Sequence, residues 1–309
     1  MRFLKYISIL NVVLILIINK LGAQQIGNSS HLQETRVAWN PAVTAFDNFG
    51  VFDAFFRMQW LGFSGAPVTG FISAQYPILR QNMSVGGVLH FDQTGPVSKY
   101  GVQLNYAYKL KEILGRYDQV SFGISANFQQ YVFNASGLVI NEANDPLLQA
   151  QRHSAFFPSA GLGIFYNSNQ RAYRGNSFFT GISISQGLTS QVLVNESNQR
   201  RERHFHFTAG GNIYGYNGFV QPSVTANMVS PDIIDILYSI KYEMKDSFWA
   251  GAGYASSGMM TVQGGVILND FGSRNSALRL GVLANYGISS GLSRLGPGFE
   301  FYIGYIFKT

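Results

Sequence analysis

The segment that most constrains the fold of this chain is the last one, residues 298–309. Every second residue there is apolar, and all but one of these residues are aromatic: Phe299, Phe301, Ile303, Tyr305 and Phe307. Successive side chains of a β-strand point to opposite faces, so this period of two predicts a strand with one apolar face. The strand stops close to the last residue and has an aromatic near its end, as the closing strand of an outer-membrane barrel does. We therefore expect it to pair with the first strand and close a transmembrane barrel.

Thirteen further segments alternate in the same way. The fourteen predicted strands cover residues 54–61, 67–77, 84–92, 101–110, 120–129, 158–166, 176–186, 204–214, 219–228, 234–245, 248–254, 259–268, 278–288 and 298–308. Fourteen is an even number, as single-chain bacterial barrels require. Isolated charges fall in the polar rows, and we expect them to form charge networks in the lumen because a bilayer disfavours charge: Arg57, Lys109, Lys241, Glu243, Arg279 and Glu300.

A soluble β-sandwich is the alternative all-β fold. It would turn its polar rows outward, which needs more Lys and Glu than this chain contains. Only 12% of the residues are charged, against roughly 25% in ordinary soluble domains. The chain has no Cys, which excludes disulfides and Cys-ligated metals. Three of the six excess positive charges lie in the first 20 residues, so the charge does not indicate nucleic-acid binding.

Residues 1–23 have the pattern of a secretory signal peptide. Arg2 and Lys5 form a basic start, residues 6–18 are mostly apolar, and Ala23 is a small residue at the expected cleavage point. A membrane anchor is the alternative, but an anchor needs about 20 apolar residues. The sequence therefore predicts export through a cleaved signal peptide.

Residues 24–50 are polar and show no sustained period. The segment contains Asn40 and Pro41, and proline biases its predecessor toward extended geometry. We expect an ordered turn that leads into the barrel and packs in the lumen, or a flexible periplasmic tail. The barrel itself then takes residues 51–309. If both termini are periplasmic, the two longest gaps, residues 135–157 and 187–203, face outside.

Catalytic and metal-binding motifs are sparse. The sequence has no G-x-S-x-G, no phosphate-binding glycine loop and no H-E-x-x-H. His204 and His206 share one strand face, yet two imidazoles without a third ligand make a weak metal site. We therefore expect no catalytic residue, no metal and no cofactor.

Motifs in the first third of the chain resemble one family. After Asn40 and Pro41, the most specific run comprises Arg57, Gln59, Trp60, Gly62, Gly65, Ala66 and Pro67. This order resembles the PorP/SprF family of outer-membrane proteins of the type IX secretion system, found in Bacteroidota. The resemblance is strong to about residue 111 and looser beyond. Residues 298–301 depart from the acidic start typical of the family's last strand.

The motif has two interpretations. It can contact a partner, or it can serve barrel architecture alone. In the second case Trp60 lies at the lipid interface, Gly62 and Gly65 make a tight bend, and Pro67 restarts the next strand.

The resemblance implies a non-enzymatic protein of the outer membrane. Its partners would be the type IX secretion machinery, outer-membrane lipid and the C-terminal domain of secreted cargo, including gliding adhesins, but not nucleic acid. It would dock, export or retain that cargo at the cell surface. Two alternatives stay open: a porin or small-solute channel, and a barrel enzyme that uses His204 and His206.

Overall fold

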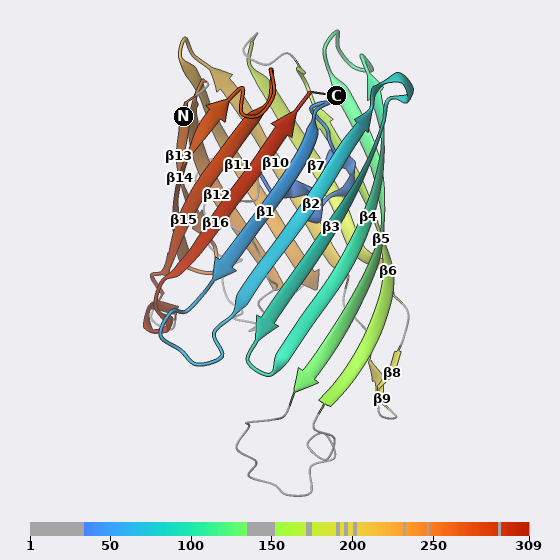
Figure 1. Cartoon of the computed structure of the whole chain (residues 1–309), viewed down its shortest axis with the longest axis vertical. Helices are drawn as coiled ribbons and strands as arrows, with labels where there is room; N and C mark the ends of the chain where they lie inside the picture. The colour runs from blue at the N-terminus through green and yellow to red at the C-terminus, as the bar shows by residue number, and fades with distance from the viewer. Residues whose placement is uncertain are drawn as a thin grey trace, which may run out of the picture.

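The chain folds into one closed barrel of fourteen antiparallel strands (Figure 1). The computed structural model describes residues 34–134, 152–170, 175–189, 192–194, 197–199, 203–230, 233–245, 247–289 and 292–308. The barrel strands are β1 (Gly50–Met58), β2 (Val68–Ile78), β3 (Met83–Thr94), β4 (Val97–Lys111), β5 (Gln119–Asn134), β6 (Arg152–Asn167), β7 (Ser177–Thr189), β10 (His204–Tyr214), β11 (Gly218–Ser230), β12 (Ile233–Met244), β13 (Phe248–Ala255), β14 (Met259–Asn269), β15 (Ala277–Gly287) and β16 (Gly298–Phe307). The predicted all-β barrel and its strand number are confirmed.

The last strand closes the barrel on the first. β1 pairs with β16 in nine register pairs that run from Gly50–Phe307 to Met58–Phe299. The predicted position of the first strand, residues 54–61, is wrong by several residues at each end. The ladder stops at Met58 because its partner β16 begins at Gly298, and Trp60 beyond it turns into the left-handed region with φ 53°.

The two ends of the barrel differ. The end that carries the start of β1 and the end of β16 is called here the terminal rim, and the opposite end the loop rim. The three longest connections between barrel strands, residues 135–151, 190–203 and 288–297, leave the loop rim. β5 and β6 reach furthest in that direction (Figure 1). Within the second connection the short strands β8 (Val192–Val194) and β9 (Ser197–Gln199) form a hairpin that the sequence did not predict.

Burial alternates along the strands with the polar side inward. On β16, Glu300 and Tyr302 are buried, whereas Phe301 and Ile303 are about half exposed on the outer wall. The same arrangement recurs on the other strands, so apolar side chains form the outer surface and polar side chains line the lumen. This is the distribution expected of a barrel surrounded by lipid. In the described residues we find no helix long and apolar enough to cross a membrane.

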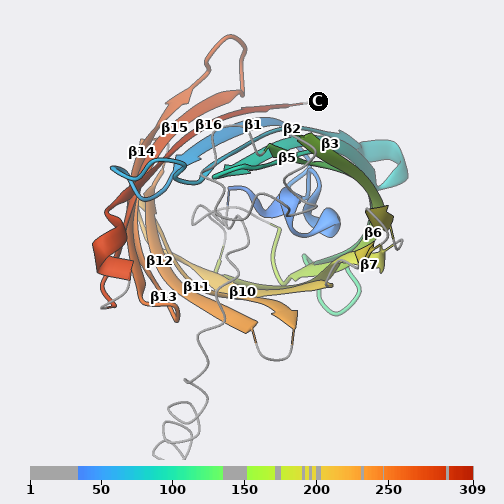
Figure 2. The ribbon, with the colours of Figure 1, turned by 90° about the horizontal axis from the view of Figure 1, so that it is seen from below.

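A short segment before β1 fills part of the lumen. Residues 34–49, called the plug below, contain two 3₁₀ turns, η1 (Arg36–Ala38) and η2 (Pro41–Val43). Figure 2 shows these turns inside the ring of strands. The signal-peptide prediction for residues 1–23 falls outside the described residues, as do residues 24–33.

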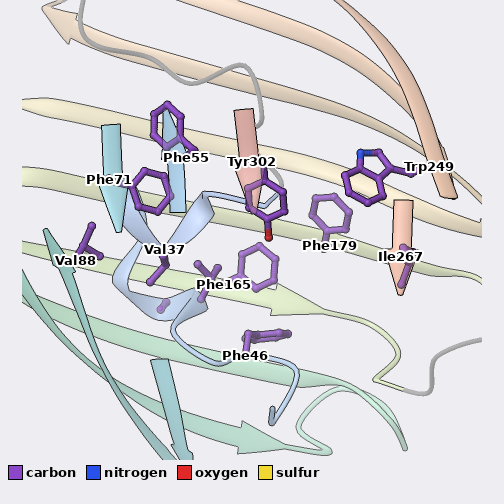
Figure 3. Packing of buried hydrophobic residues seen from close by; sticks show 12 residues of the cluster. Val37, Phe46, Phe55, Phe71, Val88, Phe165, Phe179, Trp249, Ile267 and Tyr302 are labelled. Atoms are coloured by element: carbon purple, nitrogen blue, oxygen red, sulfur yellow. The ribbon is translucent and has the colours of Figure 1, made fainter. Parts of the chain in front are cut away.

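The plug and the inner wall share one apolar cluster (Figure 3). Val37 and Phe46 come from the plug, and inward-facing side chains from several strands surround them, including Phe55, Phe71, Phe165, Phe179, Trp249, Ile267 and Tyr302. Phe46 meets Phe165 edge to face, with ring centroids 4.7 Å apart. The hydrophobic core of this protein therefore lies between the plug and the inner wall of the barrel.

Candidate functional site: the plugged lumen

Asn40 organises the plug and ties it to the wall. Its Oδ1 accepts a hydrogen bond from the backbone N–H of Ala42 at 2.9 Å, which makes it the N-cap of η2. Pro41 occupies the first position of η2, where a missing N–H costs nothing. The Asn40 Nδ2 group donates to the carbonyl oxygens of Ile164 on β6 at 3.1 Å and Ile182 on β7 at 3.4 Å.

Three inward-facing glycines make room for this turn. A Cβ on Gly123 of β5 would overlap the backbone of Pro41 and Ala42, and a Cβ on Gly163 of β6 would overlap the Asn40 side chain. A Cβ on Gly181 of β7 would lie 2.6 Å from the Phe165 ring and 3.2 Å from Asn40 Nδ2. The sequence placed Gly123 in a polar row, but nothing in the alternation indicated that the plug rests on it.

Polar side chains of the wall bond the backbone of the plug. An irregular buried segment needs such partners, since an unpaired buried amide or carbonyl costs about 1–3 kcal/mol. Gln75 accepts from the Ala45 N–H at 2.8 Å. The donors to plug carbonyls are Gln103 and Asn105 to Val37, Gln119 to Phe46, Ser183 to Trp39, and Lys109 to Ala45.

Glu34 joins a charge network at the terminal rim. Its Oε1 lies 2.9 Å from Lys241 Nζ and 3.8 Å from Arg279 Nη2. Arg279 donates two hydrogen bonds to the Glu243 carboxylate, at 3.1 and 2.8 Å, and Lys241 Nζ lies 3.3 Å from Glu243 Oε2. The Arg279 guanidinium also stacks over Trp249 at 4.6 Å. The predicted lumenal charge network is confirmed here, but the contribution of Glu34 was missed because its long-range partner leaves no signal in the sequence.

The second network lies at the barrel seam. Arg57 on β1 and Glu300 on β16 are register partners, and Arg57 Nε lies 3.1 Å from Glu300 Oε1. Both side chains are almost completely buried, 4% and 0% exposed. This ion pair closes the lumenal side of the β1–β16 junction.

The rest of the family motif forms the connection between β1 and β2 at the loop rim. Gly62 and Gly65 have φ values of 108° and 75°, which only glycine adopts readily. The Gly65 carbonyl accepts from Gly95 N–H at 2.9 Å, so this connection contacts the β3–β4 turn. The Gln59 N–H donates to the Pro67 carbonyl at 3.0 Å, next to Ala66, and closes the base of the connection.

The motif residues therefore occupy two places. Asn40 and Pro41 lie in the plug against β6 and β7, whereas Arg57 lies on β1, nearly opposite in the ring of strands. Trp60 is half-buried in the β1–β2 connection. Partner contact by these residues stays a prediction.

His204 and His206 lie on β10 with ring centroids 6.4 Å apart. His206 Nδ1 contacts Asn227 Oδ1 at 2.6 Å, and its ring lies 5.1 Å from that of Trp39 in the plug. No group of three or more His, Cys, Asp or Glu residues that could hold a metal occurs in the described part of the chain. Packing against the plug accounts for His206 without catalytic chemistry.

Two solved structures with a similar fold are titled as monoaromatic hydrocarbon channels. A structure titled "CymD monoaromatic hydrocarbon channel" is similar with a TM-score of 0.56 and 10% sequence identity, covering 92% of this chain and 95% of that one. A "TodX deltaS2S3 mutant monoaromatic hydrocarbon channel" gives a TM-score of 0.54 and 10% identity, covering 88% and 94%. At this identity the likeness shows the fold alone. A search among curated proteins found no match.

The sequence itself carries a family assignment. The profile described as "Type IX secretion system membrane protein PorP/SprF" matches residues 21–305, nearly the whole chain. The match includes every motif residue from Asn40 to Pro67, together with the plug and almost all of the barrel. The chain belongs to the PorP/SprF family of type IX secretion system membrane proteins.

Proposed function

We propose that this barrel docks, exports or retains secreted cargo at the cell surface for the type IX secretion system. As a barrel of this family, the chain lies in the outer membrane and crosses it with strands; the family is a component of a secretion system, not an enzyme family. The cargo would be a protein with a C-terminal secretion domain, such as an adhesin.

The observation that supports docking over diffusion is the plug. Side chains or carbonyls of seven strands hold it: β2, β4, β5, β6, β7, β12 and β15. A pore for solutes needs a continuous aqueous path, and barrels that leave one usually have 16 to 18 strands. A fourteen-stranded barrel with a bonded segment in its lumen suits a rigid support for partners at its rims.

The rims differ as this role requires. The longest connections leave the loop rim, which we assign to the cell exterior because external loops of such barrels are longer than periplasmic turns. The terminal rim then faces the periplasm and the machinery. We expect deletion of residues 143–149, which lie outside the described residues, to impair cargo display while the barrel still assembles. Unchanged display would count against docking by this loop.

A channel is the second candidate, because two solved structures with a similar fold are titled as monoaromatic hydrocarbon channels. Recordings of ionic current through the purified barrel in planar bilayers distinguish docking from channel function. We expect no steady ohmic conductance of porin size. A stable large conductance would remove the support that the plug gives to docking.

The most direct test is an affinity pull-down of the tagged barrel from crosslinked, detergent-solubilised outer membranes, analysed by mass spectrometry. Docking predicts recovery of a large secreted protein with its C-terminal domain, together with secretion-machine components. Recovery of the barrel alone, repeated under crosslinking, would contradict the proposal.

A further inference from the structure

Lys241, Glu243 and Arg279 form a wall cluster with more positive than negative charge. Two cations face one carboxylate, so the three side chains together carry a formal charge of +1. Their exposed fractions are only 7%, 10% and 12%. A buried charge without a counter-charge is strongly unfavourable. The carboxylate that contacts the cluster is that of Glu34, which is 6% exposed. Two further charges lie within electrostatic range without contacting the cluster: Asp53, which interacts with Glu34 and Arg279, and Arg36, which interacts with Glu34.

The four groups are not equivalent. Arg279 and Glu243 are joined by two hydrogen bonds, which satisfies the fork of the guanidinium. Lys241 bridges the two carboxylates, 3.3 Å from Glu243 and 2.9 Å from Glu34. Glu34 is therefore held by the ammonium of Lys241 and, at 3.8 Å, by Arg279. The wall supplies a fixed site for one carboxylate, and the plug supplies that carboxylate.

The cluster lies where another carboxylate can replace that of Glu34. Lys241 and Glu243 precede the end of β12 at Met244, and Arg279 follows the start of β15 at Ala277. Both strand ends belong to the terminal rim. Glu34 precedes η1 at the start of the plug, and its contact with Lys241 lies close to the terminal rim of the lumen.

We propose that Lys241, Glu243 and Arg279 form a carboxylate-binding site that Glu34 fills in cis and that takes another carboxylate when Glu34 is absent. In the cell the competing group would be an acidic side chain or terminal carboxylate of a polypeptide at the terminal rim. That last step rests on the function proposed above, whereas the binding site itself does not.

The test removes the cis carboxylate and supplies a small one. The variant Glu34→Ala is folded in detergent, and its thermal unfolding is followed in acetate and in chloride at equal ionic strength. We expect acetate to raise the unfolding midpoint of Glu34→Ala saturably, with the folded-to-unfolded ratio rising about 100-fold at an acetate concentration 100 times the dissociation constant. Wild type should not respond, because Glu34 occupies the site.

Two control variants define the site. Glu34→Ala combined with Lys241→Met should lose the acetate response. Asp92→Ala removes a carboxylate from the Asp92–Lys99 pair, whose lysine side chain is 28% exposed and solvated, so acetate should not stabilise it. An equal response to acetate in Glu34→Ala and in wild type or Asp92→Ala overturns the proposal, as does a response that survives Lys241→Met.

A charge-balance measurement covers the case in which Glu34→Ala does not fold. Glu34→Gln keeps the side-chain volume but leaves the cluster at +1, so it should be less stable than wild type. Adding Lys241→Met restores neutrality and should recover stability. A double variant less stable than Glu34→Gln alone would refute the site. Because none of these assays contains cargo, their outcome is independent of the pull-down that tests docking.

Discussion

The ion pair at the barrel seam provides the sharpest prediction. Arg57 and Glu300 lie 3.1 Å apart with 4% and 0% of their side chains exposed. Substituting one partner removes the counter-charge of the other inside the buried junction, which typically costs about 3–5 kcal/mol. We expect Arg57→Met and Glu300→Met each to lower the free energy of unfolding by about that amount.

The double variant separates pairing from burial. Replacing a buried ion pair by apolar side chains of similar volume is often neutral or stabilising by about 1–4 kcal/mol. Arg57→Met combined with Glu300→Met should therefore be much more stable than the sum of the single effects predicts. The coupling free energy from this double-mutant cycle measures how far the two seam residues act as a unit.

The assay is urea unfolding of the barrel in lipid vesicles, followed by the fluorescence of its 3 tryptophans. Lys99→Met is the matched control, because the Asp92–Lys99 pair has similar geometry at 3.1 Å but is partly exposed. Exposed pairs contribute about 0–1 kcal/mol. Single seam variants that cost less than about 1 kcal/mol, or additive effects in the double variant, would refute the reasoning.

Three further variants test the plug; the first two are followed by hydrogen exchange of residues 34–49 and the third by its unfolding midpoint. Gly163→Ala should displace the turn at Asn40 and speed the hydrogen exchange of the plug. Gly87→Ala, with no atom nearer than 3.9 Å to its new Cβ, should not. Equal exchange rates in both variants would contradict the idea that the plug needs the space left by Gly163. Lys109→Met removes the donor to the Ala45 carbonyl and to Asn48, so residues 45–48 should exchange faster and stability fall by about 1–3 kcal/mol; wild-type exchange there would rule out this anchor. Asn40→Ala loses an N-cap worth about 0.5–2 kcal/mol, and an unchanged unfolding midpoint would show that η2 needs no cap.

The strand pattern was predictable because it depends on a local rule. Phe301 and Ile303 face outward while Glu300 and Tyr302 face inward, as the period of two requires. Strand ends were less predictable. β1 begins at Gly50 and ends at Met58 because its ladder is limited by β16, a strand more than two hundred residues away. No local pattern contains that information.

In the lumen, too, some features followed from the local pattern and others did not. The inward charges Arg57, Lys241 and Arg279 were predicted from their place in polar rows, and they do pair in the lumen. Their partners were predicted only in part. Glu300 was in the set, but Glu34 lies in a segment without periodicity, and the sequence left that segment between lumen and periplasm.

The sequence by itself determined the barrel, its strand number and its family, because alternation, low charge and motif order are written into consecutive residues. Only the tertiary structure decided that residues 34–49 occupy the lumen and that Gly123, Gly163 and Gly181 leave the space for them. The reason is physical. A strand's face follows from its own pattern, whereas the fit of an irregular segment depends on side chains and carbonyls contributed by strands far apart in the chain.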